Sequence, residues 1–155
     1  RDAQESRGLG DVYKRQNQSM STKGVLRGLH FQKQYPQTKL VRAIKGSVFD
    51  VAVDLRAGSE TYGKWYGIEL TEENKKQFFI PKNFAHGFVV LSDSAEFAYK
   101  CTDFYHPNDE GGLKWDDPEI GVEWPMPEGM TEADLTLSDK DKVWSGISEY
   151  VKNRK

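Results

Sequence analysis

Short apolar runs separated by turn-forming residues fill most of the chain from Gly24 onward. In the clearest run, VFDVAVDL, apolar side chains occupy every second position, and two aspartates fall among the positions between them. A period of two is that of a β-strand with one apolar and one mixed face. Similar runs are KLVRAI, YGIEL, QFFI, GFVVL and AEFAYKCT, and Lys45-Gly46 after the first of these predicts a hairpin turn. The pattern predicts a mostly β domain, a sandwich or barrel in which closure hides the strand edges.

The last third of the chain has a different character. The stretch NDEGGLKWDDPEIGVEWPMPEGM holds three of the six prolines and predicts irregular loops that wrap the barrel. After Ser138, the apolar residues recur at the spacing of a helix, and these residues are Val143, Ile147, Tyr150 and Val151. This spacing predicts a short amphipathic C-terminal helix.

The N-terminal stretch RDAQESRGLGDVYKRQ, residues 1–16, is polar and shows neither strand alternation nor a helical stripe. We expect a poorly ordered tail here. One domain over residues 17–155 would follow, which suits a chain of 155 residues.

Composition and charge narrow the class of protein. With 37% hydrophobic and 30% charged residues, the chain is typical of a globular protein. Its 22 basic and 24 acidic residues give a net charge of -2, so no overall positive field would attract nucleic acid. No apolar run is long enough to cross a bilayer, and a secretory signal pattern is absent. Cys101 is the only cysteine, which excludes an intrachain disulfide and favours a cytoplasmic location.

Of the three histidines, His30 has the most informative surroundings. It lies in GVLRGLHFQ, where apolar residues frame Arg27 and His30 and two glycines permit close backbone approach. A structural histidine is one interpretation. The other is a base that removes a proton from carbon, with Arg27 holding an anionic substrate.

His86, in IPKNFAHGF, fits a turn residue and a substrate contact equally well, and His106 in FYHPND has no predicted role. A metal centre of the kind common in double-stranded β-helix proteins would need a second histidine and an acid close to His30. The chain has Gln32 there and no carboxylate between Leu26 and Phe49. We therefore expect no metal.

Two further residues have structural interpretations that local sequence favours. Asp141, in LSDKD, falls three residues after Ser138, as in an N-terminal capping box. Tyr99 alternates with Phe97 in EFAYKCT, as a half-buried strand residue would.

The segments of the chain, in order, resemble those of the dTDP-4-dehydrorhamnose 3,5-epimerase family. The resemblance runs from Asn17 to Asp141 through NQSMSTKGVLRGLHFQ, KLVRAIKGSVFDVAVDLRAGS, YGKWYGIELTEEN, IPKNFAHGFVVLS, AEFAYKCTDFY, GGLKWDDPEIGVEWP and LSDKD. It implies a double-stranded β-helix, the cupin-like jelly-roll barrel. It also implies an isomerase that inverts two carbons of a dTDP-4-keto-6-deoxy sugar without metal or nicotinamide cofactor.

The resemblance assigns catalytic roles to four residues. His30 matches the base, and Asp141 matches the carboxylate that orients it and makes it more basic. Lys39 matches the lysine beside the ketone, where an ammonium stabilises the enolate oxygen. Tyr99 matches the proton donor on the opposite ring face, and a phenol with a pKa of ~10 stays protonated at working pH.

For binding, six residues match the family's substrate contacts: Arg27, Asn17, His86, Glu110, Lys140 and Phe104. Arg27 would bind the diphosphate, and Phe104 would stack on the thymine ring. The family also implies a homodimer and a pathway leading to dTDP-rhamnose and cell-surface polysaccharide.

The chain departs from the family at three places. Family members have an N-terminal segment with strands that cross to the partner subunit and an arginine that helps to hold the nucleotide, whereas residues 1–16 resemble translated adapter or vector sequence. Gln16 replaces a common acidic residue, and Asn83 replaces a common glycine, a mild change because Asn tolerates left-handed backbone angles.

Other functions fit the same residues. A relative that inverts only one carbon would use the same side chains, and a cupin-like sugar-binding or structural domain would need none of the chemistry. A metal-dependent cupin oxygenase is a fourth interpretation, which stoichiometric iron or zinc would support.

Overall fold

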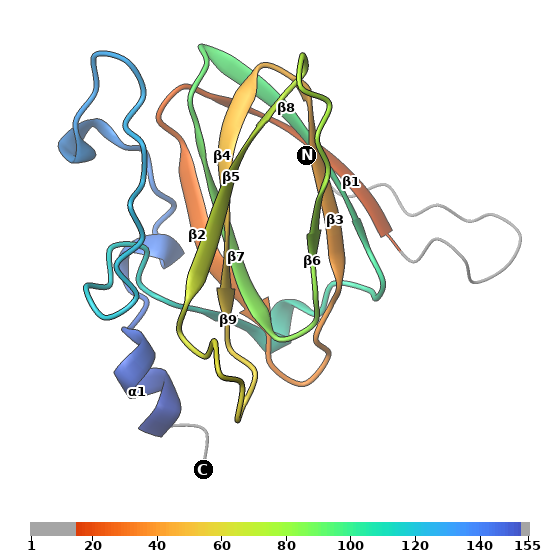
Figure 1. Ribbon diagram of the computed structural model, residues 1–155, viewed down its shortest axis with the longest axis vertical. Helices are drawn as coiled ribbons and strands as arrows, with labels where there is room; N and C mark the ends of the chain where they lie inside the picture. Colours follow the sequence, from red (N-terminus) through yellow and green to blue (C-terminus); the bar gives the residue numbers. More distant parts are fainter. Residues whose placement is uncertain (1–14, 153–155) are drawn as a thin grey trace, which may run out of the picture.

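The computed structural model describes residues 15–152, which form two antiparallel sheets that face each other (Figure 1). The first sheet has the strand order β1 (Arg15–Thr22), β8 (Ser94–Cys101), β3 (Lys39–Lys45) and β6 (Phe78–Ile80). The second has the order β5 (Trp65–Thr71), β4 (Ser47–Asp54), β7 (Phe84–Val90), β2 (Leu26–Gln32) and β9 (Glu110–Gly112). The predicted mostly β architecture is confirmed.

Strand β4 is buried on both faces, because each of its faces belongs to a different core. Val48 and Ala52 point into the space between the two sheets, where they pack with residues of the first sheet. Val51 and Val53 point outward from the second sheet and pack against the C-terminal part of the chain. The mixed face predicted for this strand therefore looks into the barrel, and its Asp50 is an acid placed inside.

The C-terminal part of the chain covers the outer face of the second sheet, as Figure 1 shows for the blue segment beside β2. Its apolar residues complete a core with those of the sheet, and these residues are Leu113, Ile120, Trp124, Leu135 and Ile147. Trp124 Nε1 also donates a hydrogen bond to the carbonyl of Trp115 at 2.9 Å. The predicted wrapping by the last third is confirmed.

The turn at Lys45-Gly46 is present, but it is not the hairpin turn predicted. It leads from β3 in the first sheet to β4 in the second, and β4 pairs with β5 and β7 instead. Gly46 has φ 69°, and a Cβ there would lie 2.1 Å from the carbonyl oxygen of Ser94. The local pattern identified the turn, whereas the choice of partner strand depends on the packing of both sheets.

The C-terminal helix α1 (Ile147–Lys152) is confirmed, but it is shorter than the predicted periodicity. Val143 does not belong to it: this residue follows the 3-10 turn η3 (Lys140–Lys142) and is 76% exposed. The helix begins at Ile147 because Asp117 Oδ2 accepts a hydrogen bond from the Ile147 N–H at 2.7 Å. No helix in residues 15–152 is long and apolar enough to cross a membrane.

At the N-terminal end, β1 pairs with β8 from Arg15 onward, so the strand includes two residues that the sequence assigned to the tail. Residues 1–14 lie outside the described residues. The expected tail over most of its length therefore stays a prediction.

Candidate active site

The predicted base His30 lies on β2, directly opposite His86 on β7. The two neighbouring strands approach each other closely beside these histidines because both carry glycine there. A Cβ at Gly28, whose φ is 134°, would come within 2.5 Å of the Gly87 Cα, and a Cβ at Gly87 would come within 2.7 Å of the Arg27 carbonyl oxygen. The predicted close approach at Gly28 is thus present, and it brings the histidines side by side.

His30 is joined to Asp141 by a hydrogen bond from Nε2 to Oδ1. Asp141 is buried and also accepts a hydrogen bond from Ser138 Oγ at 2.8 Å. Burial tends to raise the pKa of Asp141, but the hydrogen bonds from His30 and Ser138 and the charges of His30 and Lys140 bring that pKa below its ordinary value. The carboxylate is therefore charged. The predicted capping box at Ser138 is wrong, because Asp139 is the N-terminal cap of η3 and makes no side-chain cap hydrogen bond. The Asp141 carboxylate instead accepts from the Ser138 hydroxyl and pairs with His30.

Because Asp141 accepts the Nε2 proton, Nδ1 of His30 is left as the basic nitrogen. This Nδ1 lies 3.9 Å from Oε1 of Glu110. Glu110 in turn accepts hydrogen bonds from Lys140 Nζ at 2.7 and 2.9 Å. Four of the ten predicted site residues are thus joined by direct contacts.

His86 pairs with Asp50, a residue that sequence reasoning missed. Nε2 of His86 donates to both carboxylate oxygens of Asp50, at 2.9 and 3.0 Å, and both side chains are buried. Burial raises the pKa of Asp50, and it lowers the pKa of His86, so the imidazole is neutral. The signal in the sequence was the mixed face of this strand, where Asp50 lies between Val48 and Ala52, two residues that line the barrel.

Lys39 faces these groups from the first sheet, at the start of β3. Burial lowers the pKa of Lys39 below its ordinary value of 10.5, while the charges of Cys101, Asp50 and Glu110 act in the opposite direction. A desolvated ammonium held near carboxylates is an electrophilic group for an oxygen that becomes negative.

Tyr99 lies on β8, also in the first sheet, and packs against the core between the sheets. Its ring centroid is 6.2 Å from that of Phe97, whose own ring stacks on His86 at 6.3 Å. Strand β8 lies between β3 and β1, and Asn17 on β1 is the residue paired with Tyr99 across that second edge. Tyr99 and Lys39 therefore belong to one wall of the barrel, and His30 and His86 to the facing wall.

Two predicted binding residues lie at exposed positions. Arg27 is exposed on β2, three residues before His30. Phe104 is 52% exposed in the loop that follows β8. Their places are compatible with contacts to parts of a ligand that project from the barrel.

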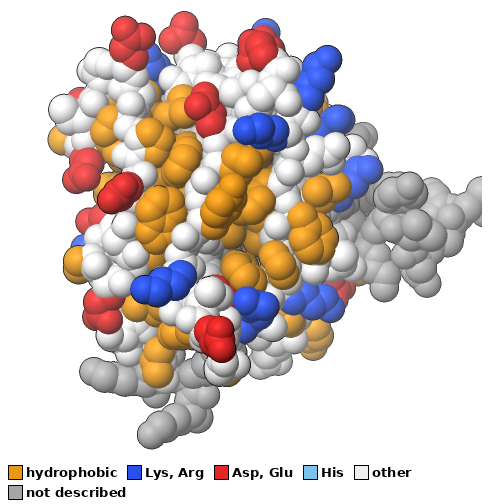
Figure 2. All heavy atoms as spheres, viewed as in Figure 1, with side chains coloured by type: hydrophobic (Ala, Val, Ile, Leu, Met, Phe, Trp, Pro, Cys, Tyr) orange, Lys and Arg blue, Asp and Glu red, His pale blue; other side chains and the backbone are white. Residues whose placement is uncertain are grey.

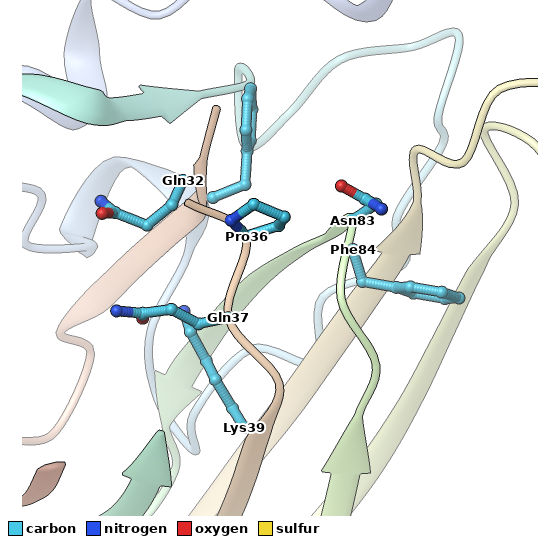
Figure 3. A pocket seen from close by; sticks show the side chains of 7 residues that line it. Gln32, Pro36, Gln37, Lys39, Asn83 and Phe84 are labelled. Atoms are coloured by element: carbon cyan, nitrogen blue, oxygen red, sulfur yellow. The ribbon is translucent and has the colours of Figure 1, made fainter. Parts of the chain in front are cut away.

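A pocket opens beside Lys39, as Figure 3 shows. Gln32 at the end of β2 and Gln37 before β3 line it on one side, and Asn83 and Phe84 at the start of β7 on the other. Of the ten predicted site residues, it is lined by Lys39 alone. Asn83 has φ 63°, a left-handed angle consistent with its replacing a glycine.

Within residues 15–152 no group of three or more His, Cys, Asp or Glu side chains is arranged to hold a metal ion. His30 and His86 are each bonded to a carboxylate through Nε2. The absence of a metal and of a cofactor stays a prediction.

Comparisons with known proteins give one consistent result. The family model described as dTDP-4-dehydrorhamnose 3,5-epimerase matches residues 1–149. The dTDP-4-dehydrorhamnose 3,5-epimerase of Methanothermobacter thermautotrophicus is 54% identical over 142 residues, which are 92% of this chain and 75% of that protein.

Solved structures agree in fold. The dTDP-6-deoxy-D-glucose-3,5-epimerase of Legionella pneumophila, in complex with dTDP-4-keto-L-rhamnose, matches with a TM-score of 0.83 at 51% identity, over 90% of this chain and 72% of that one. A 3'-monoepimerase of Streptomyces bikiniensis, in complex with dTDP-quinovose, has the same TM-score at 27% identity, over 92% of this chain and 70% of that one. The predicted cupin-like fold is confirmed, and the chain belongs to the dTDP-4-dehydrorhamnose 3,5-epimerase family of isomerases.

Proposed function

We propose that this protein converts dTDP-4-keto-6-deoxyglucose to dTDP-4-keto-rhamnose by inverting C3 and C5. The observation that carries the proposal is the arrangement of proton-handling groups on facing walls of one barrel. His30 with Asp141 belongs to the wall of β2, and Tyr99 with Lys39 belongs to the wall of β3 and β8. A sugar ring between these walls has a base on one face and an acid on the other, which is what inversion requires.

In the first step, Nδ1 of His30 takes the proton from a carbon beside the ketone. The electron pair of the broken C–H bond moves toward the ketone oxygen, which becomes an enolate. Lys39 stabilises that oxygen with its ammonium group, and this interaction strengthens as the negative charge develops. Asp141 stabilises the imidazolium that forms on His30.

In the second step, the phenol of Tyr99 gives its proton to the same carbon from the opposite face. The C–H bond is restored with inverted configuration, His30 has gained a proton, and Tyr99 has lost one. Exchange with solvent then returns both groups to their starting states. The substrate carbon therefore takes up a hydrogen that came from water.

The Asp50–His86 pair supports this chemistry without exchanging protons with the sugar. Neutral His86 directs its Nε2–H at Asp50, which leaves its Nδ1 able to accept a hydrogen bond from a sugar hydroxyl. The Asp50 charge raises the pKa of Lys39 and so favours the protonated form that the enolate needs.

The rest of the substrate contacts residues around this centre. Arg27 binds the diphosphate, and Phe104 stacks on the thymine ring. Asn17, Glu110 and Lys140 contact the sugar and the phosphates. The exposed positions of Arg27 and Phe104 support this assignment, because a nucleoside diphosphate is too long to be enclosed with the sugar.

A protein that inverts a single carbon is the second candidate, favoured by the likeness to the Streptomyces bikiniensis 3'-monoepimerase. The higher identity to 3,5-epimerases favours double inversion. No similarity to a relative described above favours a binding domain without catalysis or a metal-dependent oxygenase.

Proton NMR in deuterated water with dTDP-4-keto-6-deoxyglucose tests the proposal. We expect deuterium with inversion at both C3 and C5, and exchange at neither carbon in His30→Ala beyond the rate without enzyme. In Tyr99→Phe we expect no inversion, although His30 can still return deuterium to the face from which it took the proton. Tyr66→Phe is the matched control, because Tyr66 lies exposed on β5 outside the site. Deuterium at one carbon would establish the single inversion, and none with the parent protein would contradict an epimerase.

We also propose a cytoplasmic homodimer that acts in the synthesis of cell-surface polysaccharide. Exposed apolar side chains support the dimer: Met20 on β1 is 75% exposed, and Phe79 on β6 is 60% exposed. Figure 2 shows apolar side chains gathered along the middle of the face where β5 and β6 lie. Light scattering that gives the mass of a single chain at all concentrations would contradict the dimer.

A further inference from the structure

The loop that carries Phe104 is fastened to the neighbouring loop between β2 and β3. Gln37 in that neighbouring loop donates both hydrogens of its amide to the Phe104 loop. Its Nε2 lies 3.1 Å from the carbonyl oxygen of Asp103 and 2.7 Å from that of Phe104. These two carbonyls flank the Cα of Phe104, so one side chain restrains the backbone on both sides of the aromatic residue.

Further contacts hold the same loop on either side of Phe104. Oε1 of Gln32 accepts a hydrogen bond from the His106 N–H at 3.0 Å. The ring of Tyr35 stacks on that of His106, with centroids 4.1 Å apart and planes at 20°. Asp103 Oδ1 accepts from the Phe104 N–H at 2.8 Å. The loop is therefore fixed while the Phe104 ring itself stays exposed.

The same two glutamines line the pocket beside Lys39, where Figure 3 shows them on the side of β2 and β3. One group of side chains thus forms a wall next to the lysine and also holds the loop of the exposed aromatic ring. A ring that is ordered before the ligand arrives can stack on a base at a lower cost in conformational entropy than a ring on a free loop.

We propose that Gln37 is a positioning residue for the nucleobase, acting through the ring of Phe104, and that Gln32 assists it. The inference rests on the proposed function, in which Phe104 stacks on thymine. A glutamine suits this role because its amide offers two donors to two carbonyls without a charge. A glutamate of the same shape would direct carboxylate oxygens at those carbonyls and release the loop.

Titration calorimetry with dTDP and with inorganic pyrophosphate tests the inference. In Gln37→Met, which keeps the length but not the donors, we expect the Kd for dTDP to rise about fivefold, the effect of lost hydrogen bonds. We expect Gln37→Glu to raise the Kd for dTDP at least as much. The Kd for pyrophosphate stays unchanged in both variants, because it lacks the base. The matched control is Gln34→Ala, whose exposed side chain lies on the same loop.

A double-mutant cycle separates positioning from a general structural effect. We expect Phe104→Ala combined with Gln37→Met to bind dTDP no more weakly than Phe104→Ala alone, and the KM of Gln37→Met to rise with kcat unchanged. Equal losses for dTDP and pyrophosphate, or fully additive losses in the cycle, would overturn the inference.

Two results distinguish this inference from the proposals on which it rests. An unchanged dTDP affinity in Phe104→Ala would refute the stacking role, and the role of Gln37 with it. Deuterium exchange by the parent protein decides separately whether the protein is an epimerase.

Discussion

At the scale of single residues, the site depends on which carboxylate meets which base inside the barrel. Asp141 pairs with His30, and Asp50 pairs with His86. The resemblance to a family identified the first pair, whereas local sequence pattern alone favoured a cap for Asp141. No pattern within the chain could identify the second pair, because Asp50 and His86 are brought together by the pairing of β4 with β7.

Replacing Asp141 by Asn tests the first pair. An amide cannot stabilise the imidazolium and can fix the wrong tautomer of His30, so we expect kcat to fall by roughly 10²-fold or more. Asp139→Asn is the control: its side chain is fully exposed in the same turn, and we expect its kcat to equal that of the parent. Steady-state kinetics at neutral pH measures both. A kcat for Asp141→Asn within a factor of about two of the parent would remove Asp141 from the mechanism.

Replacing Asp50 by Asn tests the second pair through the pH dependence of the rate. The Asn Oδ1 can still accept from His86, but the negative charge that raises the pKa of Lys39 is lost. Activity needs protonated Lys39, so it declines as the pH rises through the pKa of that lysine. The pKa falls in the variant, and we expect the alkaline decline in kcat to begin at lower pH.

The control for this profile is Asp54→Asn, on the same strand. Asp54 is bonded to Arg56, Ser59 and Thr61, outside the site. We expect its alkaline decline to coincide with that of the parent. If the alkaline decline in kcat moved by the same amount in both variants, the shift would reflect a general disturbance of β4 and not the pKa of Lys39.

At the scale of elements, the pairing of β2 with β7 decides where the histidines lie. The sequence predicted a close approach at Gly28, and the structure supplies its partner in Gly87. Pattern alone could not pair the two, since 59 positions separate Gly28 and Gly87 along the chain. The same limit explains the turn at Lys45-Gly46, where the turn was predicted and its destination was not.

Gly87→Ala tests the close approach of β2 and β7. The new Cβ would lie 2.7 Å from the Arg27 carbonyl oxygen and 3.1 Å from the Gly28 Cα, so the strands must separate. We expect the free energy of unfolding to fall by about 1–3 kcal/mol, the usual cost of overpacking, with a loss of kcat as the histidines move. Urea unfolding and kinetics measure the two effects. Gly58→Ala is the control for kcat: Gly58 has φ 75°, so alanine strains the backbone there, but its Cβ meets no atom within 4 Å and we expect kcat to equal that of the parent.

At the scale of the whole molecule, alternation of apolar and polar residues predicted the barrel. The prolines and turn formers of the last third predicted irregular loops that wrap it. Both predictions rest on local physics, because strands alternate and loops carry turn formers. Assignment of the two faces of β4 needed the complete fold, since one face meets the first sheet and the other meets the C-terminal segment. The roles of the ten site residues stay predictions that the experiments above address.

The C-terminal segment has one further consequence for how the enzyme is assembled. It supplies Asp141 to the site, although the remaining catalytic candidates stand on strands of the barrel. A chain whose sheets have formed but whose cover has not docked would hold His30 without its carboxylate. During refolding, recovery of turnover should therefore lag behind recovery of the β-sheet circular dichroism signal. The enzyme would stay inactive until the C-terminal segment has docked and brought Asp141 to His30.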